Sequence, residues 1–209
     1  MRELFGIERA SEGVLFAGGT DKAIARALLR KTSLPVEEHE RHIDAVLDAY
    51  LRALDRELSH RRYVPVGDVA GAVTACKAMG ACVGLATGNV REGARRKLAS
   101  AGLDALFDLE KGGFGCDGEH RPDVLRAAVV RCAPHAPPGA PVVVVGDTRH
   151  DVTAARAIGA KVIGVAVSKA ARDELTAAGA DLIVDDCGHD VVRAIVAVAL
   201  HSSSSRRIG

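Results

Sequence analysis

An unbroken apolar run, VVVV at residues 142–145, leads directly into Gly146 and Asp147 and limits the possible folds more than any other feature. A strand with one wet face alternates apolar and polar residues, whereas a continuous apolar run indicates burial on both faces. Two similar runs follow, KVIGVAV and DLIVD, each after a helical pattern. Alternating strands and helices of this kind predict an α/β fold, in which helices flank a parallel sheet.

The same alternation extends back to about residue 65. The segment VAGAVTACKAMG predicts a helix, the run ACVGLAT at 81–87 predicts a short buried strand, and REGARRKLASAG predicts a helix that stops at Gly102. RPDVLRAAVVRC predicts a helix with a proline in its first turn. We therefore place one α/β core at residues 65–201.

Residues 1–64 carry helical patterns without a convincing strand. Thr20 is a suitable N-cap for DKAIARALLR, and residues 36–58 repeat apolar side chains every three or four positions. A pair of antiparallel helices is the economical arrangement, so we expect a small helical domain here. At the other end, we expect the serine-rich tail of residues 202–209 to be disordered.

Composition excludes several classes of function. The net charge is +1 with the basic residues spread along the chain, which gives no footprint for nucleic acid or an anionic membrane. No apolar run reaches 18 residues, and MRELFGIERA lacks the apolar centre of a signal peptide. Five cysteines without a CxxC pair indicate reduced thiols and a cytoplasmic protein. The expected partner is a small molecule, and the sequence leaves open whether the chain forms a homodimer.

The strand predicted at 81–87 ends in a group suited to an anion. Thr87, Gly88 and Asn89 lie just before a predicted helix N-terminus near Arg91. Free backbone N–H groups and the helix dipole at such a terminus attract negative charge. Because parallel strands end at one edge of their sheet, this loop is expected at the ligand-binding edge.

A second group of polar residues follows the valine run. Asp147 and Asp151 lie one helical turn apart, and carboxylate oxygens are ligands that Mg²⁺ prefers. An anion site beside a hard-cation site suggests a phosphate ester and its metal. Each residue also has a simpler interpretation, in which Asp147, Asp151 and Asn89 cap or turn the chain and Thr87 satisfies its own turn. The histidines, among them His120, His135, His150 and His189, lack ligand spacing and are expected at the surface.

LATGN, Arg121 and GDTRHDV resemble motifs two, three and four of the haloacid dehalogenase-like hydrolases, most closely the phosphoglycolate-phosphatase-like branch. The resemblance covers nearly the whole chain and implies a Rossmann-like core with a small helical cap, to which AGGTDKAI is similar. It implies that Thr87 and Arg121 are catalytic and bind phosphate together with Gly88 and Asn89. It also implies that Asp147 and Asp151 bind Mg²⁺. A solvated helix-start role is the alternative for Arg121.

The family's first motif, DxDx(T/V), is not found in this sequence. Its first Asp attacks phosphorus in the family, and the strand that carries it lies between the strands ending at Thr87 and Asp147. Its loss is expected to leave a gap of about 9–10 Å or a direct pairing of the two neighbours. We therefore expect the natural chain to start upstream of Met1, which translation of the preceding genomic region tests.

The sequence thus predicts a Mg²⁺-dependent phosphomonoesterase by ancestry, acting on a small phosphorylated metabolite. Residues 1–209 are expected to be inactive, because losing the nucleophile removes nearly all turnover. The alternative is a non-catalytic binding or interaction protein that keeps the anion and metal edge. A response-regulator receiver domain also places acids at strand ends, but LATGN and the helical cap argue against it.

Overall fold

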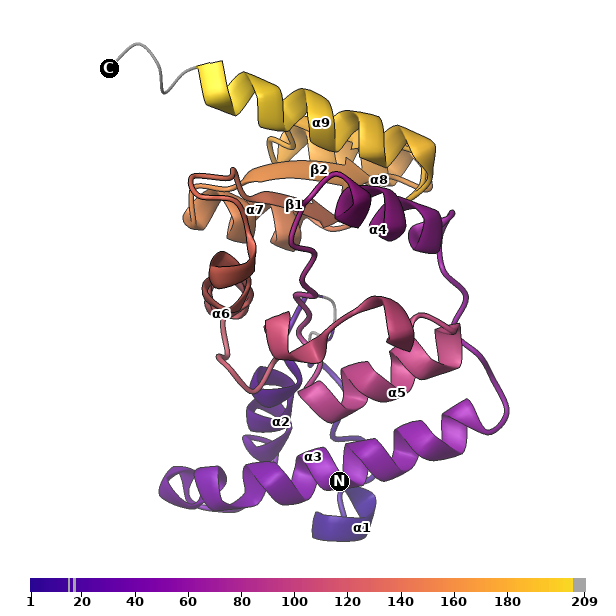
Figure 1. The fold of residues 1–209 in the computed structure, drawn as a ribbon. Coiled ribbons are helices and arrows are strands. Elements are labelled where there is room, and N and C mark those ends of the chain that lie inside the picture. Colours follow the sequence, from indigo (N-terminus) through magenta and orange to yellow (C-terminus); the bar gives the residue numbers. More distant parts are fainter. Residues whose placement is uncertain (15, 17, 205–209) are drawn as a thin grey trace.

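A computed structural model describes residues 1–14, 16 and 18–204, with the backbone alone for residues 2, 3 and 201–204. Figure 1 shows two groups of elements: the sheet with its covering helices, and a second group that contains α2, α3 and α5. The sheet consists of β1 (Val143–Gly146), β2 (Lys161–Val165) and β3 (Leu182–Val184). All pairs are parallel and the order is β1-β2-β3, which confirms the predicted α/β class.

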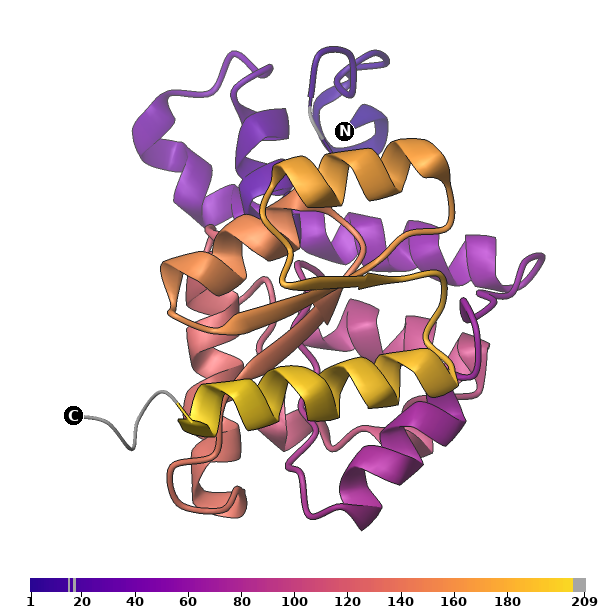
Figure 2. The same cartoon turned by 90° about the horizontal axis from the view of Figure 1, so that it is seen from above.

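Helices lie on both faces of this sheet (Figure 2). Burial of the whole valine run, as its continuous apolar pattern predicts, is wrong at two positions, since Val142 and Val145 are 37% and 39% exposed. On one face, Val144 and Val162 pack in a cluster with side chains of α7 and α8. On the other, Val143 and Ile163 pack with side chains of α9. The helices of this part are α4 (Val69–Ala78), α6 (Arg121–Cys132), α7 (Arg149–Ala157), α8 (Lys169–Ala177) and α9 (His189–Ser204).

The second group contains α1 (Arg2–Phe5), α2 (Asp21–Leu29), α3 (His39–Leu58) and α5 (Arg91–Ala101). Ala25, Leu29 and Ile43 form its buried cluster with Val46, which packs α2 against α3. α3 also packs against α5. Short 3₁₀ turns occupy Val36–Glu38, Asp104–Leu106, Leu109–Lys111 and Ala133–His135.

Thr20 caps α2, as predicted, and also anchors it. Its hydroxyl oxygen accepts a hydrogen bond from Ala23 N at 3.2 Å, and the hydroxyl donates to Glu119 O at 3.1 Å. Glu119 also accepts a hydrogen bond from Arg26 Nε at 2.8 Å through its side chain. These contacts fasten the N-terminal helices to the loop that precedes α6.

The expected strand at 81–87 does not form. Its backbone makes one isolated parallel bridge, Ala86 to Gly113, with hydrogen bonds from Thr87 N to Gly113 O and from Gly113 N to Leu85 O. Within the described part of the chain, β1 pairs with β2 alone. Of the two arrangements foreseen around the absent strand, direct pairing of its neighbours is therefore the wrong one. An extended apolar run becomes a strand only where a neighbour completes its ladder of backbone hydrogen bonds.

The C-terminal end is helical further than expected. Residues 202–204 continue α9, and residues 205–209 of the expected tail lie outside the described residues. No described helix combines the length and apolar character needed to span a membrane. The boundary expected between residues 64 and 65 falls in the extended linker that joins α3 to α4.

Candidate active site

Asp151 is held at the start of α7, just beyond β1, by a reciprocal pair of hydrogen bonds. Thr148 Oγ1 accepts from Asp151 N at 3.3 Å, and Asp151 Oδ2 accepts from Thr148 N at 3.1 Å. This capping box satisfies donors that the first helical turn leaves without partners. Gly146 allows the close approach, because a Cβ at that position would lie 2.4 Å from Asp151 Cβ. The local sequence therefore fixes this carboxylate at the edge of the sheet.

Arg121, the first residue of α6, binds the same carboxylate. Its Nε and Nη2 atoms lie 2.8 and 2.7 Å from Asp151 Oδ1. Thr148 Oγ1 adds a hydrogen bond to Asp151 Oδ2 at 2.8 Å, and Asp151 is only 6% exposed. The structure thus brings two predicted site residues together. Asp151 caps its helix as the simpler interpretation has it, whereas Arg121 is an ion-pair partner rather than a solvated helix-start residue.

Asp147 lies beside them with an exposed side chain. Its charge, after burial and the charge of Asp186, contributes to raising the pKa of the Cys187 thiol. No three described His, Cys, Asp or Glu side chains gather into a group that could hold a metal ion. Both Asp151 oxygens already accept contacts from Arg121 and Thr148, so the exposed Asp147 has the freer carboxylate of the two. One or two carboxylates suit Mg²⁺, which completes its octahedron with waters and phosphate oxygens.

The Thr87–Asn89 loop forms the other half of the predicted site. Thr87 Oγ1 accepts hydrogen bonds from Asn89 N at 3.2 Å and from Asn89 Nδ2 at 2.6 Å. The N-cap of α5 is Val90, whose side chain cannot cap the helix. The first-turn amides of α5 therefore lack the usual capping oxygen, which is the condition for attracting an anion.

An internal carboxylate, Asp21, lies at this helix N-terminus. Val90 N donates to Asp21 Oδ2 at 2.8 Å, and Asp21 N donates to Gly88 O at 2.7 Å. Burial raises the pKa of the Asp21 carboxyl, while the Val90 hydrogen bond and the Lys97 charge act in the opposite direction. The sequence shows Asp21 only as a first-turn acid of α2, so its contact with a loop almost 70 residues away carries no local signal.

The glycine-rich segment 18–20 touches both halves of the site. A Cβ on Gly18 would lie 2.2 Å from the His150 ring, and a Cβ on Gly88 would lie 2.5 Å from Gly19 O. His150 is thus half-buried beneath this segment rather than free at the surface, as the sequence suggested. The other three histidines singled out above are exposed: His120, His135 and His189.

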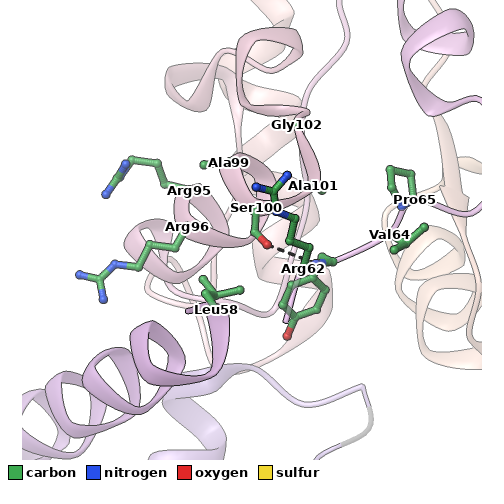
Figure 3. A pocket seen from close by; sticks show the side chains of 11 residues that line it. Leu58, Arg62, Val64, Pro65, Arg95, Arg96, Ala99, Ser100, Ala101 and Gly102 are labelled. Carbon is green, nitrogen blue, oxygen red and sulfur yellow. Dashed lines mark hydrogen bonds between the residues drawn. The ribbon is translucent and has the colours of Figure 1, made fainter. Parts of the chain in front are cut away.

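A separate hollow of about 630 Å³ lies at the linker between α3 and α4, away from these residues (Figure 3). Tyr63 N donates to Ser100 Oγ across it at 3.2 Å. Arg95 and Arg96 extend away from Pro65 in Figure 3, and both bind Glu92. The lining of the hollow includes none of the predicted site residues, so it is separate from the candidate site.

Comparison with known proteins supports the fold described above. Solved structures of similar fold include CbbY from Rhodobacter sphaeroides in complex with phosphate, at 17% identity and a TM-score of 0.59, covering 84% of this chain and 78% of that one. A mutant of CbbY in complex with xylulose-(1,5)bisphosphate gives 18% identity and a TM-score of 0.60, with 88% and 82% coverage. A haloacid dehalogenase-like family hydrolase from Streptococcus pneumoniae gives 14% and 0.52, with 85% and 80% coverage.

The search of curated proteins gives no match. The family model of the haloacid dehalogenase-like hydrolases matches residues 6–159, which is most of the chain and includes both halves of the site. On the strength of that match, this chain belongs to the haloacid dehalogenase-like hydrolase family.

Proposed function

We propose that the edge formed by the β1–α7 turn and the Thr87–Asn89 loop binds the phosphate group of a small phosphorylated metabolite together with Mg²⁺. The contact of Arg121 with Asp151 carries this proposal. This contact supports a cation beside the turn that follows β1, and Asp147 follows the same strand with an exposed carboxylate. Ligands of open α/β sheets bind at such strand ends. The phosphate and sugar bisphosphate in the CbbY structures support the class of ligand.

Each residue has a distinct role in this proposal. The Thr87 hydroxyl donates a hydrogen bond to a phosphate oxygen, and the Arg121 guanidinium offsets negative charge while Asp151 keeps it in place. Asp147 contributes the free carboxylate for Mg²⁺, with Asp151 as a direct or supporting ligand. Bound Mg²⁺ would supply charge neutralisation for the phosphate oxygens.

Hydrolysis by way of a phosphoenzyme requires a carboxylate in line with the leaving group. The sequence contains no DxDx(T/V) motif to supply it. We therefore propose that residues 1–209 alone bind a phosphate ester and do not hydrolyse it.

Calorimetric titration with orthophosphate, with and without Mg²⁺, tests the binding site. Arg121→Ala should weaken binding about tenfold or more, because a hydrogen bond between charged groups contributes about 1.5–3 kcal/mol. Arg126→Ala is the matched control, since it removes an exposed arginine of the same helix that pairs with Asp123. Equal affinity in the wild type and Arg121→Ala would rule out this phosphate site.

Turnover is measured separately as phosphate release from p-nitrophenyl phosphate in the presence of Mg²⁺. We expect none from residues 1–209. Release that disappears in Arg121→Ala but not in Arg126→Ala would overturn the proposed inactivity and demand another nucleophile.

A non-catalytic binding protein is the second candidate. Every buried side-chain nitrogen or oxygen atom of the described residues has a hydrogen-bond partner, as expected of a part of the chain that folds stably. Such a protein would bind orthophosphate and remain a compact monomer or dimer in solution. Size-exclusion chromatography beside the two assays above separates it from an incomplete enzyme, which would aggregate.

A further inference from the structure

Lys97 lies against the candidate site although no motif in the sequence includes it. Its Nζ atom donates to Asn89 Oδ1 at 2.5 Å, and Tyr50 Oη donates to the same oxygen at 3.3 Å. The ammonium group also lies 5.8 Å from the centre of the Tyr50 ring and 5.6 Å from that of Tyr63. Burial lowers the pKa of Lys97, against the charges of nearby acids, Asp21 first among them. The Lys97 side chain is therefore half-buried rather than fully solvated.

These contacts fix the orientation of the Asn89 amide. A lysine ammonium carries donors and no acceptor, so the Asn89 atom that faces it must be the carbonyl oxygen. The amide nitrogen then faces the opposite way, where it donates to Thr87 Oγ1 at 2.6 Å. Assignment of an amide from its hydrogen-bond partners is unambiguous when one partner can only donate.

The orientation of Asn89 in turn determines what the Thr87 hydroxyl can do. A hydroxyl has two acceptor lone pairs and one hydrogen, and the two donors of Asn89 occupy both lone pairs. Among the described residues, Thr87 Oγ1 has hydrogen bonds with Asn89 alone. Its hydrogen is thus left to donate to a ligand.

We propose that Lys97 and Tyr50 are positioning residues that act through Asn89 to keep the Thr87 hydroxyl as an outward hydrogen-bond donor for an oxyanion. With the amide reversed, Nδ2 would face the ammonium donor, and Asn89 Oδ1 would accept the Thr87 hydrogen. The hydroxyl would then present a lone pair to the anion. The inference rests on the proposed function for its ligand, but the orientation of Asn89 is a property of the free protein.

The device also links the N-terminal helices to the site. Tyr50 is on α3, Asn89 precedes α5, and Lys97 is on α5, so the packing of α3 against α5 contributes one of the two donors. The hydrogen bond from Tyr50 to Asn89 Oδ1 is longer than the one from Lys97, so Lys97 is the main residue that orients the Asn89 amide.

The first test uses the free protein. In ¹H–¹⁵N NMR spectra, the Asn89 side-chain amide should shift in Thr87→Val, which removes its acceptor, and in Lys97→Met, which releases its carbonyl. Lys169→Met is the matched control, because Lys169 is an exposed lysine of α8 paired with Asp173. An Asn89 amide that responds to neither site variant while both remain folded would overturn the proposed orientation, whatever the protein binds.

The second test measures orthophosphate affinity in a double-mutant cycle of Asn89→Asp with Thr87→Val. A carboxylate at position 89 accepts the Thr87 hydrogen, so the hydroxyl no longer donates to the anion. Asn89→Asp should therefore lose about tenfold or more in orthophosphate affinity. Plain charge repulsion would persist in the Thr87→Val background, whereas loss through the hydroxyl would not. Strongly non-additive losses support the proposal, and fully additive losses overturn it.

The two tests separate the two proposals. Absence of orthophosphate binding by the wild type would overturn the proposed function. The NMR response of Asn89 would still decide whether Lys97 and Thr87 are linked through its amide. Thermal unfolding of each variant shows that the fold is retained.

Discussion

Two apolar runs that look alike in the sequence take up different structures. Residues 142–145 run into β1, which pairs with β2 and packs through Val144 on one face and Val143 on the other. Residues 81–87 make a single bridge at Ala86. Neither run is fully buried, since Val142 and Val145 are 37% and 39% exposed and residues 81–87 are half-buried or exposed. The difference shows that a neighbouring strand, rather than apolar composition alone, selects regular β-structure. The second run is held at Gly113 by two backbone hydrogen bonds, from Thr87 N to Gly113 O and from Gly113 N to Leu85 O.

The two halves of the candidate site differ in the same way. Asp151 is fixed by Thr148, three residues away, and by the start of α6. Thr87 depends on Asn89, whose partners come from α3 and α5. The Asp151 half combines a local capping box with one contact to Arg121, 30 residues away. The Thr87 half takes further contacts from Tyr50 and Asp21, which lie 39 and 69 residues from the loop residues that they bind. Changes in packing should therefore affect the two halves unequally.

The largest expected effect comes from a pair of identical truncations, one beside each run. Leu175 of α8 is 1% exposed and packs in the cluster over β2, while Leu85 is half-buried. Leu175→Ala should cost about 2–5 kcal/mol of unfolding free energy. Leu85→Ala should cost clearly less, because less apolar surface returns to water and the site can relax.

Urea denaturation followed by circular dichroism measures both values. Leu4→Ala provides an exposed-leucine baseline at 36% exposure. If Leu85→Ala cost as much as Leu175→Ala, the second run would be as tightly integrated as the sheet, and the comparison between the two regions would fail.

Local signals explain why the fold was largely predictable. The valine run, the Thr20 cap and the Thr148 to Asp151 spacing act within a few residues, so the sequence alone indicates them. The failure of residues 81–87 to join the sheet cannot be predicted from their own sequence, since it depends on whether a neighbouring strand pairs with them. Predictions failed where a partner was distant rather than where the residue pattern was weak.

The candidate site shows the same limit. The pairing of Arg121 with Asp151 follows from the family resemblance, because both positions match its motifs. Asp21 and Lys97 could not be found in this way. Asp21 has the pattern of a first-turn helix acid, and Lys97 that of a solvated helix face. Only the fold brings them to Val90 and Asn89.

A medium effect is expected from breaking the Arg121 contact of the Asp151 half. Arg121→Met leaves the Asp151 carboxylate without its cation at 6% exposure, so we expect a loss of about 1–3 kcal/mol in unfolding free energy. Arg126→Met, which breaks an exposed pair with Asp123, should cost less than about 1 kcal/mol. Chemical denaturation at neutral pH compares them.

The same variants sharpen the comparison between the halves. Arg121→Met should leave the NMR signal of the Asn89 side-chain amide in place, because Arg121 and Asn89 have different hydrogen-bond partners. A shift of that amide as large as the one caused by Thr87→Val would show that the two halves are coupled.

The smallest effect is a pH dependence at Asp21, the carboxyl that joins the N-terminal helices to α5. Burial raises its pKa in the folded state above the ordinary value of 3.8. The folded protein therefore binds this proton more tightly than the unfolded chain, and the Asp21 contribution to stability falls as pH rises from 3.8 through the folded pKa.

Asp21→Asn removes this titration while an amide oxygen can still accept from Val90 N. The unfolding free energy of the wild type minus that of Asp21→Asn should accordingly be larger in mildly acidic buffer than at neutral pH. Asp48→Asn, an exposed change on α3, provides the background. A difference that instead grows toward neutral pH would mean that the Val90 bond and the Lys97 charge outweigh burial, and that the Thr87 half of the site is stabilised by its internal anion.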